Sequence, residues 1–462
     1  MKVRRPGSVL VLVVVIMLLS GCEEQQSAPA AQEYGPLTAP TGPRGTPEPA
    51  ARLEKFLLRD VNMPPDWKLL IKLCETVAPD QPGAARTLGA IKLALDRQRS
   101  LRLRCATLEL GEARLRQLFA CASASSRDPH VRLRALTVLP AIGGAQSMKL
   151  CVAALNDGNE GVRHTAAYVL MEIAGPPILG ELEETLDSIR LGPQEEAALT
   201  LALLRAGTRR DVSPRLEELW TESEADRASV LDAMAIVGKP AFVEYAWQGL
   251  RSKDGLVSGA AQRLFVSSAR PDDIAQAIGN LDSLYSDTLA VMNVVELPLG
   301  PEARWWGDGP LTRSGLSEWW ERHRGQWSRE KVLSEWLRFN DGTPNGDFYR
   351  REATNMLTRS WDDKYGPILV KALRERRPVA SYNAILFRLE VALALARNGK
   401  AEGIEYLIDV LGSAPGAEIW NMTVLELRRI SGLTLSGRDP QWGEWFARNR
   451  DQFAPAEKPA SP

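Results

Sequence analysis

The chain has 462 residues, with 57 lysines and arginines against 58 aspartates and glutamates, so its formal net charge is −1. The charges form no long block of one sign, and a nucleic-acid-binding face, which requires clustered basic residues, is not expected. The length is enough for two to four domain-sized cores or for one long repeat array.

The first 21 residues have the pattern of a signal peptide. A basic start with Lys2, Arg4 and Arg5 precedes an apolar run over residues 9–19, which is too short for a transmembrane helix. The run ends in the sequence LSGC at residues 19–22, which resembles the lipobox of bacterial lipoproteins. In that family the cysteine thiol is acylated and the cysteine becomes the new N-terminus.

The resemblance implies that Cys22 is lipidated, and two or three acyl chains are enough for stable membrane anchoring. An ordinary secreted protein cleaved nearby and an uncleaved anchor are the alternatives, but neither requires a cysteine here. In lipoproteins of two-membrane bacteria, Asp after the cysteine is the usual signal for retention in the inner membrane, whereas this chain has Glu23. We therefore expect a cell-envelope protein anchored in the outer membrane and facing the periplasm.

Residues 22–50 have the composition of a disordered linker. After the cysteine they contain six prolines, three glycines and almost no large apolar side chains. Residues 454–462 have the same character and predict a disordered tail. Cleavage before Cys22 would leave 54 basic residues against 58 acidic ones, a net charge of about −4.

Glycines recur at a nearly constant spacing after apolar stretches that are typical of helices. The intervals are 32, 32, 32 and 31 residues. A glycine just past a helix end supplies the left-handed C-terminal cap. A unit of this length predicts two helices that cannot bury their apolar faces alone and therefore stack on neighbouring units. The glycines are Gly111, Gly143, Gly175, Gly207 and Gly238.

A second pattern recurs at residues 128–135, 159–166 and 254–261. Each segment begins with Asp or Asn, which caps a helix N-terminus, and places a valine and an alanine four residues apart on one buried face. The pattern Asp-x-x-Val-Arg-x-x-Ala resembles the short bacterial form of HEAT repeats. The resemblance is good over residues 100–270, weaker over 48–100 and only general beyond 285. Because Asp and Arg form stacked polar ladders in that family, it implies structural roles for Arg132 and Arg163.

The C-terminal region repeats on a longer period. Residues 292–297 match 422–427 at a shift of 130, and residues 317–327 match 443–453 at a shift of 126. Residues 385–398 and 403–411 predict another helical hairpin between the copies. The expected fold is an all-α solenoid, with a HEAT-like array over residues 51–285 and a tryptophan-rich helical repeat region over residues 286–453.

Ten of the 13 tryptophans lie between Trp305 and Trp445. One interpretation is an aromatic platform that binds peptidoglycan. The other is that Trp319, Trp320 and Trp445 pack the last helix of each unit against its predecessor. Their recurrence in two copies favours packing.

Residues 341–352 partly match a twelve-residue calcium loop. Asp341 stands first, Asn345 fifth, Gly346 sixth and Glu352 twelfth, but the third and fourth positions depart from the pattern. A polar turn that caps the following helix explains the same residues and is the favoured interpretation.

The mature chain keeps four cysteines, and an oxidising compartment permits disulfides between them. Their apolar helical surroundings instead favour buried free thiols. They are Cys74, Cys105, Cys121 and Cys151.

The sequence predicts no catalytic, cofactor-binding or metal-binding residue, since it lacks the usual motifs and its three histidines have no partner at ligand spacing. We therefore expect a non-enzymatic, lipid-anchored scaffold that binds envelope proteins and no nucleic acid. Peptidoglycan association through the tryptophan-rich region is the alternative. An enzyme, such as the bilin lyases that some HEAT-like proteins resemble, is the least favoured.

Overall fold

The computed structural model describes residues 67–454, except for several short segments and single positions. These exceptions are 97–107, 109, 125, 223–225, 281–291, 302–312, 340–343, 360–362, 375–381, 414–415 and 436–439. The predicted signal peptide, Cys22, the linker, Cys105 and most of the predicted tail lie outside the described residues. The predicted domain boundaries therefore stay predictions.

The described residues form helices, with no β-strand among them and one isolated bridge between Lys400 and Ala454. The N-terminal helices are α3 (Trp67–Thr76), α4 (Ala84–Asp96), α6 (Glu112–Ala122), α7 (Pro129–Leu136), α8 (Gly144–Ala154), α9 (Glu160–Ile173), α10 (Leu179–Ser188), α11 (Pro193–Ala206), α12 (Ser213–Glu222), α13 (Arg227–Val237), α14 (Val243–Leu250), α15 (Gly255–Ser268) and α16 (Pro271–Gly279). Short turns η2 (Leu139–Ala141), η3 (Pro176–Ile178) and η4 (Pro240–Phe242) lie between them.

The C-terminal helices begin after a π-helical turn, η5 (Met292–Glu296). They are α19 (Leu297–Leu299), α20 (Arg313–His323), α21 (Arg329–Arg338), α22 (Pro344–Arg359), α23 (Gly366–Arg374), α24 (Tyr382–Arg397), α25 (Ala401–Ser413), α26 (Ala417–Ser431) and α27 (Gln441–Asn449), with turns η7 (Arg324–Gln326), η8 (Asp363–Tyr365) and η9 (Arg450–Gln452). The hairpin expected at 385–398 and 403–411 is confirmed as α24 and α25. None of the helices described is both long and apolar enough to cross a membrane.

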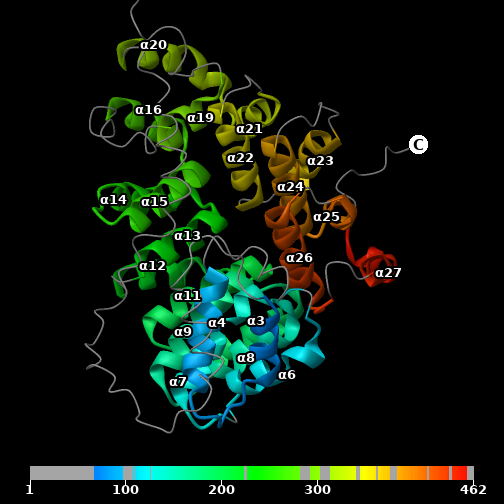
Figure 1. The fold of residues 1–462 in the computed structure, drawn as a ribbon. Coiled ribbons are helices and arrows are strands. Elements are labelled where there is room, and N and C mark those ends of the chain that lie inside the picture. Colours follow the sequence, from blue (N-terminus) through cyan, green and yellow to red (C-terminus); the bar gives the residue numbers. More distant parts are fainter. Residues whose placement is uncertain are drawn as a thin grey trace, which may run out of the picture. The chain divides into compact units, whose positions relative to one another are not determined.

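Helical hairpins stack side by side, as the repeat pattern predicts. The second helices of successive units, α7, α9, α11, α13 and α15, each pack against the next (Figure 1). Four apolar clusters fill the interior of the described part of the chain. Three have buried residues spanning 73–206, 197–320 and 266–446, and the fourth joins Leu108 to Trp420 and Val424 of α26. Their ranges overlap along the chain, because one unit buries its apolar face only against its neighbours.

The predicted helix starts are confirmed. Asp128 accepts a hydrogen bond from the main-chain N–H of His130, and Asn159 accepts one from that of Val162. Asp254 caps α15 in the same way through Leu256. These caps satisfy N–H groups that have no partner inside the helix.

The prediction of left-handed glycine caps is confirmed only at Gly207 and Gly238, where φ is 92° and 64°. It is wrong at Gly111 and Gly175, where φ is −79° and −149°. Gly143 has a φ of 66° but stands at the start of α8. The regular spacing therefore marks the junctions between helices, and each junction uses its glycine differently.

The longer C-terminal repeat is confirmed in its second half. In α20 the Nε of Arg322 donates to the main-chain oxygen of Glu318, and in α27 the Nε of Arg448 donates to that of Glu444, both over 3.2 Å. Each helix then runs into a short 3₁₀ turn, η7 or η9. The two copies thus share a local structure as well as a sequence pattern.

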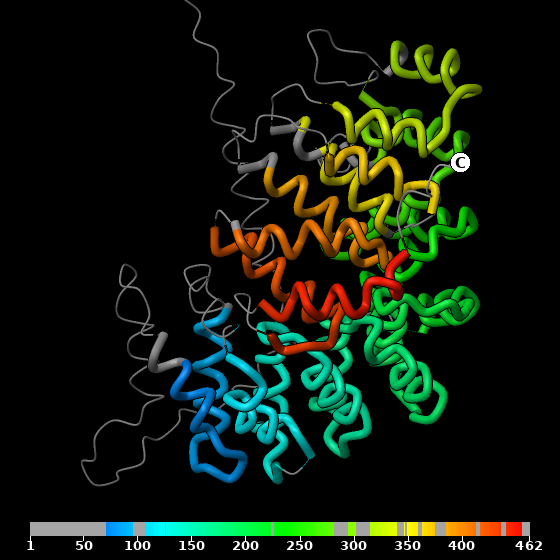
Figure 2. The backbone as a smooth tube through the Cα atoms, turned by 90° about the vertical axis from the view of Figure 1, so that its right-hand side faces the viewer, coloured from blue at the N-terminus to red at the C-terminus, as the bar shows by residue number. Residues whose placement is uncertain are grey.

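Helix α26 packs against α8 and η3, which belong to the first repeats (Figures 1 and 2). Arg428 is fully buried there, and its guanidinium donates to the main-chain oxygens of Leu108, Ile142 and Leu435. The N–H of Ala145 donates to the oxygen of Gly432 over 2.7 Å. The chain thereby joins segments about 300 residues apart in sequence.

Candidate functional site: a polar hollow beside α26

A hollow of about 580 Å³ lies where the C-terminal helices meet the repeats. Residues of α9, α11 and α13 line it together with residues of α22, α24 and α26. Its volume is within the range of small-molecule sites, although its lining is more polar than is usual for them. The charged residues of the lining are Glu172, Arg205, Asp232, Arg397, Glu426 and Arg429.

Glu426 is the buried centre of this group, with only 5% of its side chain exposed. Its Oε2 accepts from Nε and Nη2 of Arg397 at 3.1 and 2.9 Å, and its Oε1 accepts from Nε and Nη2 of Arg429 at 2.8 and 2.6 Å. Burial opposes the charged form, but the two guanidiniums outweigh it and lower the pKa of Glu426 to about 2. The carboxylate is therefore ionised at neutral pH and holds both arginines in place.

Arg429 ties this centre to the repeats. Its Nη1 donates to the main-chain oxygens of Ala174 at 3.2 Å and of Arg205 at 3.3 Å. The neighbouring Gly175 lets the backbone approach, because a Cβ on it would lie 2.4 Å from the main-chain oxygen of Arg429. This close approach, rather than a helix cap, accounts for the glycine.

The wall formed by α11 and α13 carries further charges. Arg263 of α15 forms a two-bond ion pair with Asp232, with N–O distances of 2.7 and 3.0 Å. Arg205 donates to the main-chain oxygen of Met171. Partial desolvation in the hollow lowers the pKa of Arg205, and the nearby charge of Arg397 adds to this effect, while Asp232 and Glu172 oppose it.

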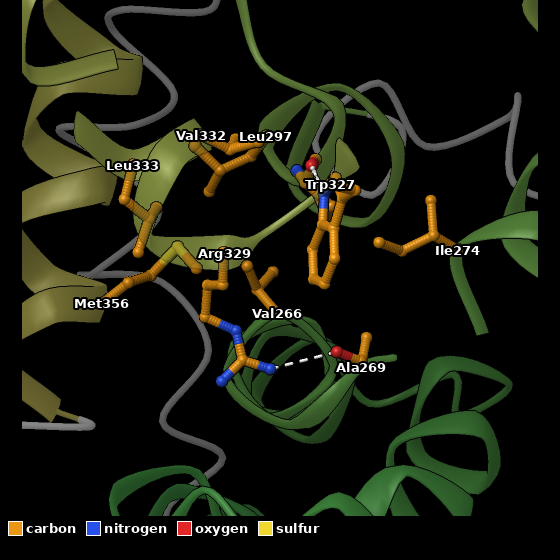
Figure 3. Close-up of a pocket in the computed structure, with 10 residues that line it drawn as sticks. Val266, Ala269, Ile274, Leu297, Trp327, Arg329, Val332, Leu333 and Met356 are labelled. Carbon is orange, nitrogen blue, oxygen red and sulfur yellow. Dashed lines mark hydrogen bonds between the residues drawn. The ribbon is translucent and has the colours of Figure 1, made fainter. Parts of the chain in front are cut away.

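A small apolar pocket lies elsewhere, between α15, α16 and the segment around α21 (Figure 3). Its volume is about 10 Å³, which is room for about one water molecule. Arg329 crosses it to donate to the oxygen of Ala269 over 3.0 Å, and Trp327 donates to the oxygen of Pro298 over 2.8 Å. This pocket is a small gap between packed helices and is too small for a ligand.

The described tryptophans mostly pack inside the protein. Trp320, Trp336 and Trp442 are at most 1% exposed. Trp319 stacks on His323 with ring centroids 4.3 Å apart, and Trp445 lies against Trp442 at 6.2 Å. Trp320 is buried in the core, and Trp319 and Trp445 are partly buried against it, which supports the packing interpretation. Trp305 lies outside the described part of the chain.

The segment that partly matches a calcium loop is mostly helical. Helix α22 begins at Pro344, so nine of the twelve positions of the calcium-loop pattern are helical, which does not fit a calcium-binding loop, and the capping turn stays a prediction. Asp341 itself lies outside the described residues. No cluster of three or more metal-ligating side chains is found in the described part of the chain.

Three of the cysteines are buried free thiols: Cys74, Cys121 and Cys151. Burial raises the pKa of the Cys74 thiol to about 12 and that of Cys121 to about 11, and it also raises that of Cys151. They are therefore protonated and unreactive at neutral pH.

The polar ladder between repeats is present, but the acidic partner of the arginines is Asp157 and not the Asp at the first position of the repeat pattern. Arg132 donates from Nε and Nη2 to Asp157 at 2.7 and 2.8 Å, and Arg163 donates to the main-chain oxygen of Asp157 at 3.0 Å. The Asp at the repeat's first position caps its own helix instead. The structural roles predicted for both arginines are confirmed.

The family model of HEAT repeats matches residues 115–191. This segment runs from within α6 to just past α10 and includes the Arg132–Asp157 ladder. HEAT repeats are a helical scaffold for protein–protein interaction and are generally not enzymes. No curated protein matches the chain. A crystal structure of an engineered protein is 14% identical and matches over 83% of this chain and 98% of its own, but its TM-score of 0.26 carries no argument about the fold.

The residues of the hollow were not predicted from the sequence. The pattern at residues 422–427 singled out Glu426 as a repeated position, but it gave no indication of its partners. A signal was available only for the docking of α26 beside the hollow: Arg428, which does not line the hollow, falls on the same apolar helical face as Val424 and Leu427. A charged residue on a buried face needs polar partners, although the sequence does not say where they lie.

Proposed function

We propose that this protein is a lipid-anchored, non-enzymatic scaffold that binds a protein partner in the bacterial cell envelope. The match of residues 115–191 to HEAT repeats supports the scaffold role. The lipobox-like sequence before Cys22 supports the anchor and the outer-membrane location facing the periplasm.

Acylation and sorting are tested in cells of the native host with the full-length chain. We expect a fatty-acid probe to label the wild type and not Cys22→Ala, which should be lost from the membrane fraction. Glu23→Asp serves as a matched control, since it should keep the label but move to the inner membrane. Continued labelling of Cys22→Ala would refute the anchor, and an inner-membrane wild type would refute the location.

Partner binding is tested by in-cell photocrosslinking. Leu256 at the start of α15 is 61% exposed, so a crosslinking residue there should leave the core intact. An exposed position on another repeat, Glu160, is the comparison. We expect a discrete protein adduct from at least one position. Normal amounts of protein without any adduct at either position would argue against a scaffold.

Peptidoglycan association remains the alternative, but no described tryptophan cluster favours it, because the aromatic rings are used in packing. Co-sedimentation of the full-length protein with purified peptidoglycan, against a chitin control, distinguishes the two. Selective sedimentation with peptidoglycan would favour this alternative.

A further inference from the structure

The hollow beside α26 holds more positive than negative charge. Its lining and the adjacent Arg263 supply four guanidiniums against the carboxylates of Glu172, Asp232 and Glu426. Asp232 is paired with Arg263, and Glu426 is paired with both Arg397 and Arg429. One positive charge is therefore in excess inside a partly enclosed space.

The excess lies among the three arginines that line the hollow, since Arg397 and Arg429 share Glu426 and the charge of Glu172 acts on Arg205. Arg205 itself donates a hydrogen bond to a neutral acceptor, the main-chain oxygen of Met171. The side chain is nevertheless accessible to solvent in the hollow. An arginine held at one end with the rest of its donors accessible can receive an oxyanion through two parallel hydrogen bonds.

The surrounding groups are already positioned. Glu426 fixes Arg397 and Arg429, and 48% of the Arg397 side chain is still exposed. Asn355, Thr358 and Asn398 add neutral polar groups from α22 and the end of α24. Because the protein already holds these side chains in place, binding a ligand would cost little of their conformational entropy, a cost that usually weakens binding.

We propose that this hollow binds a small organic anion, with its carboxylate or phosphate group on Arg205 and Arg397 and its polar body against Asn355 and Asn398. The volume of about 580 Å³ accommodates such a ligand. The proposal goes beyond the scaffold function and does not depend on it. A bound anion would contact helices of both the repeats and the C-terminal region, so it would stabilise their junction.

The test is calorimetric titration of the full-length protein with citrate and with pyrophosphate at low ionic strength, where screening is weakest. We expect binding by the wild type and a Kd about tenfold higher or more for Arg205→Gln. Arg205→Lys should be intermediate, since it keeps the charge but not the planar fork. Arg209→Gln is the matched control, because Arg209 is exposed four residues away and does not line the hollow.

Three results would overturn the proposal: no binding of either anion by the wild type, no effect of Arg205→Gln, or equal weakening by Arg205→Gln and Arg209→Gln. The last would mean general charge attraction. Hydrogen exchange on the wild type gives a readout that does not depend on a variant folding. Citrate should slow exchange at the end of α11 and in α26, and unchanged rates in both helices would also contradict the site.

Discussion

At Gly175 a missing methyl group allows two segments 255 residues apart to touch. The glycine has an extended backbone, so any residue could adopt its φ of −149°. What excludes a side chain is the main-chain oxygen of Arg429, which a Cβ would meet at 2.4 Å. The same contact carries the hydrogen bond from Arg429 to Ala174 and so forms one edge of the hollow.

Gly175→Ala should therefore destabilise the protein by about 1–3 kcal/mol, because backbone atoms must move apart. Gly180→Ala is the matched control: a Cβ there meets nothing within 4 Å, and alanine favours the helix, so its effect should be neutral or stabilising by up to ~1 kcal/mol. Urea denaturation measures both. A Gly175→Ala protein as stable as the wild type would show that α26 does not approach this closely.

Glu426 gives a pH-dependent prediction. Its folded pKa of about 2 lies below the ordinary value of 4.5, so its ionised form stabilises the fold. This stabilisation is complete above about pH 4.5 and is lost as the pH falls from 4.5 toward 2. At pH 7, Glu426→Gln should have a lower free energy of unfolding than the wild type. Between pH 4.5 and pH 2, its free energy of unfolding should fall less than that of the wild type.

Stability against denaturant, measured at several pH values, tests this, with exposed Glu112→Gln as the control. The control should follow the wild-type curve. If Glu426→Gln shows the same loss of stability below pH 4.5 as the wild type, Glu426 is not the group responsible.

Between neighbouring repeats, the pair of Arg132 and Asp157 joins one helical hairpin to the next. The side chains are 13% and 6% exposed, and Asp157 also accepts from the N–H of Asn159. Burial opposes ionisation, but the hydrogen bond and charge of Arg132 lower the pKa of Asp157. A buried charge that has lost its partner is far more costly than a lost helix cap.

Asp157→Ala should therefore cost about 3 kcal/mol, since it leaves the largely buried Arg132 without its carboxylate and with only the main-chain oxygen of Ser126 as a partner. Asp128→Ala, which removes only the cap of α7, should cost about 1 kcal/mol. Comparing the two by equilibrium unfolding isolates the contribution of the ladder. Equal costs would indicate that the ladder adds little to the repeat interface.

Across the whole molecule, the docking of α26 links the end of the chain to its first repeats. The donors of Arg428 satisfy main-chain oxygens at Leu108 and Ile142, and the oxygen of Gly432 accepts from Ala145. The N-terminal part of α8 thus depends on residues that lie much later in the sequence.

Deleting residues 417–462 should expose these groups and speed hydrogen exchange in α8, although no residue of α8 is changed. Deleting only residues 455–462 is the control and should leave exchange in α8 unchanged. The reason is local stability: removing partners of a helix lowers the free energy of its local opening. Equal protection of α8 in both truncated chains would contradict the docking.

Local sequence patterns are enough to predict the all-α fold, the length of the repeat unit, the N-terminal caps at Asp128, Asn159 and Asp254, and the duplicated tryptophan helix. Each of these depends on residues within a few turns of one another, so a local pattern carries the information. The left-handed caps expected at Gly111 and Gly175 were wrong. Three features become visible only in the folded protein: Gly175 admits Arg429, Asp157 completes the ladder, and α26 packs on the first repeats. A contact across some 300 residues produces no periodic pattern in the sequence, because the residues around one partner do not depend on those around the other.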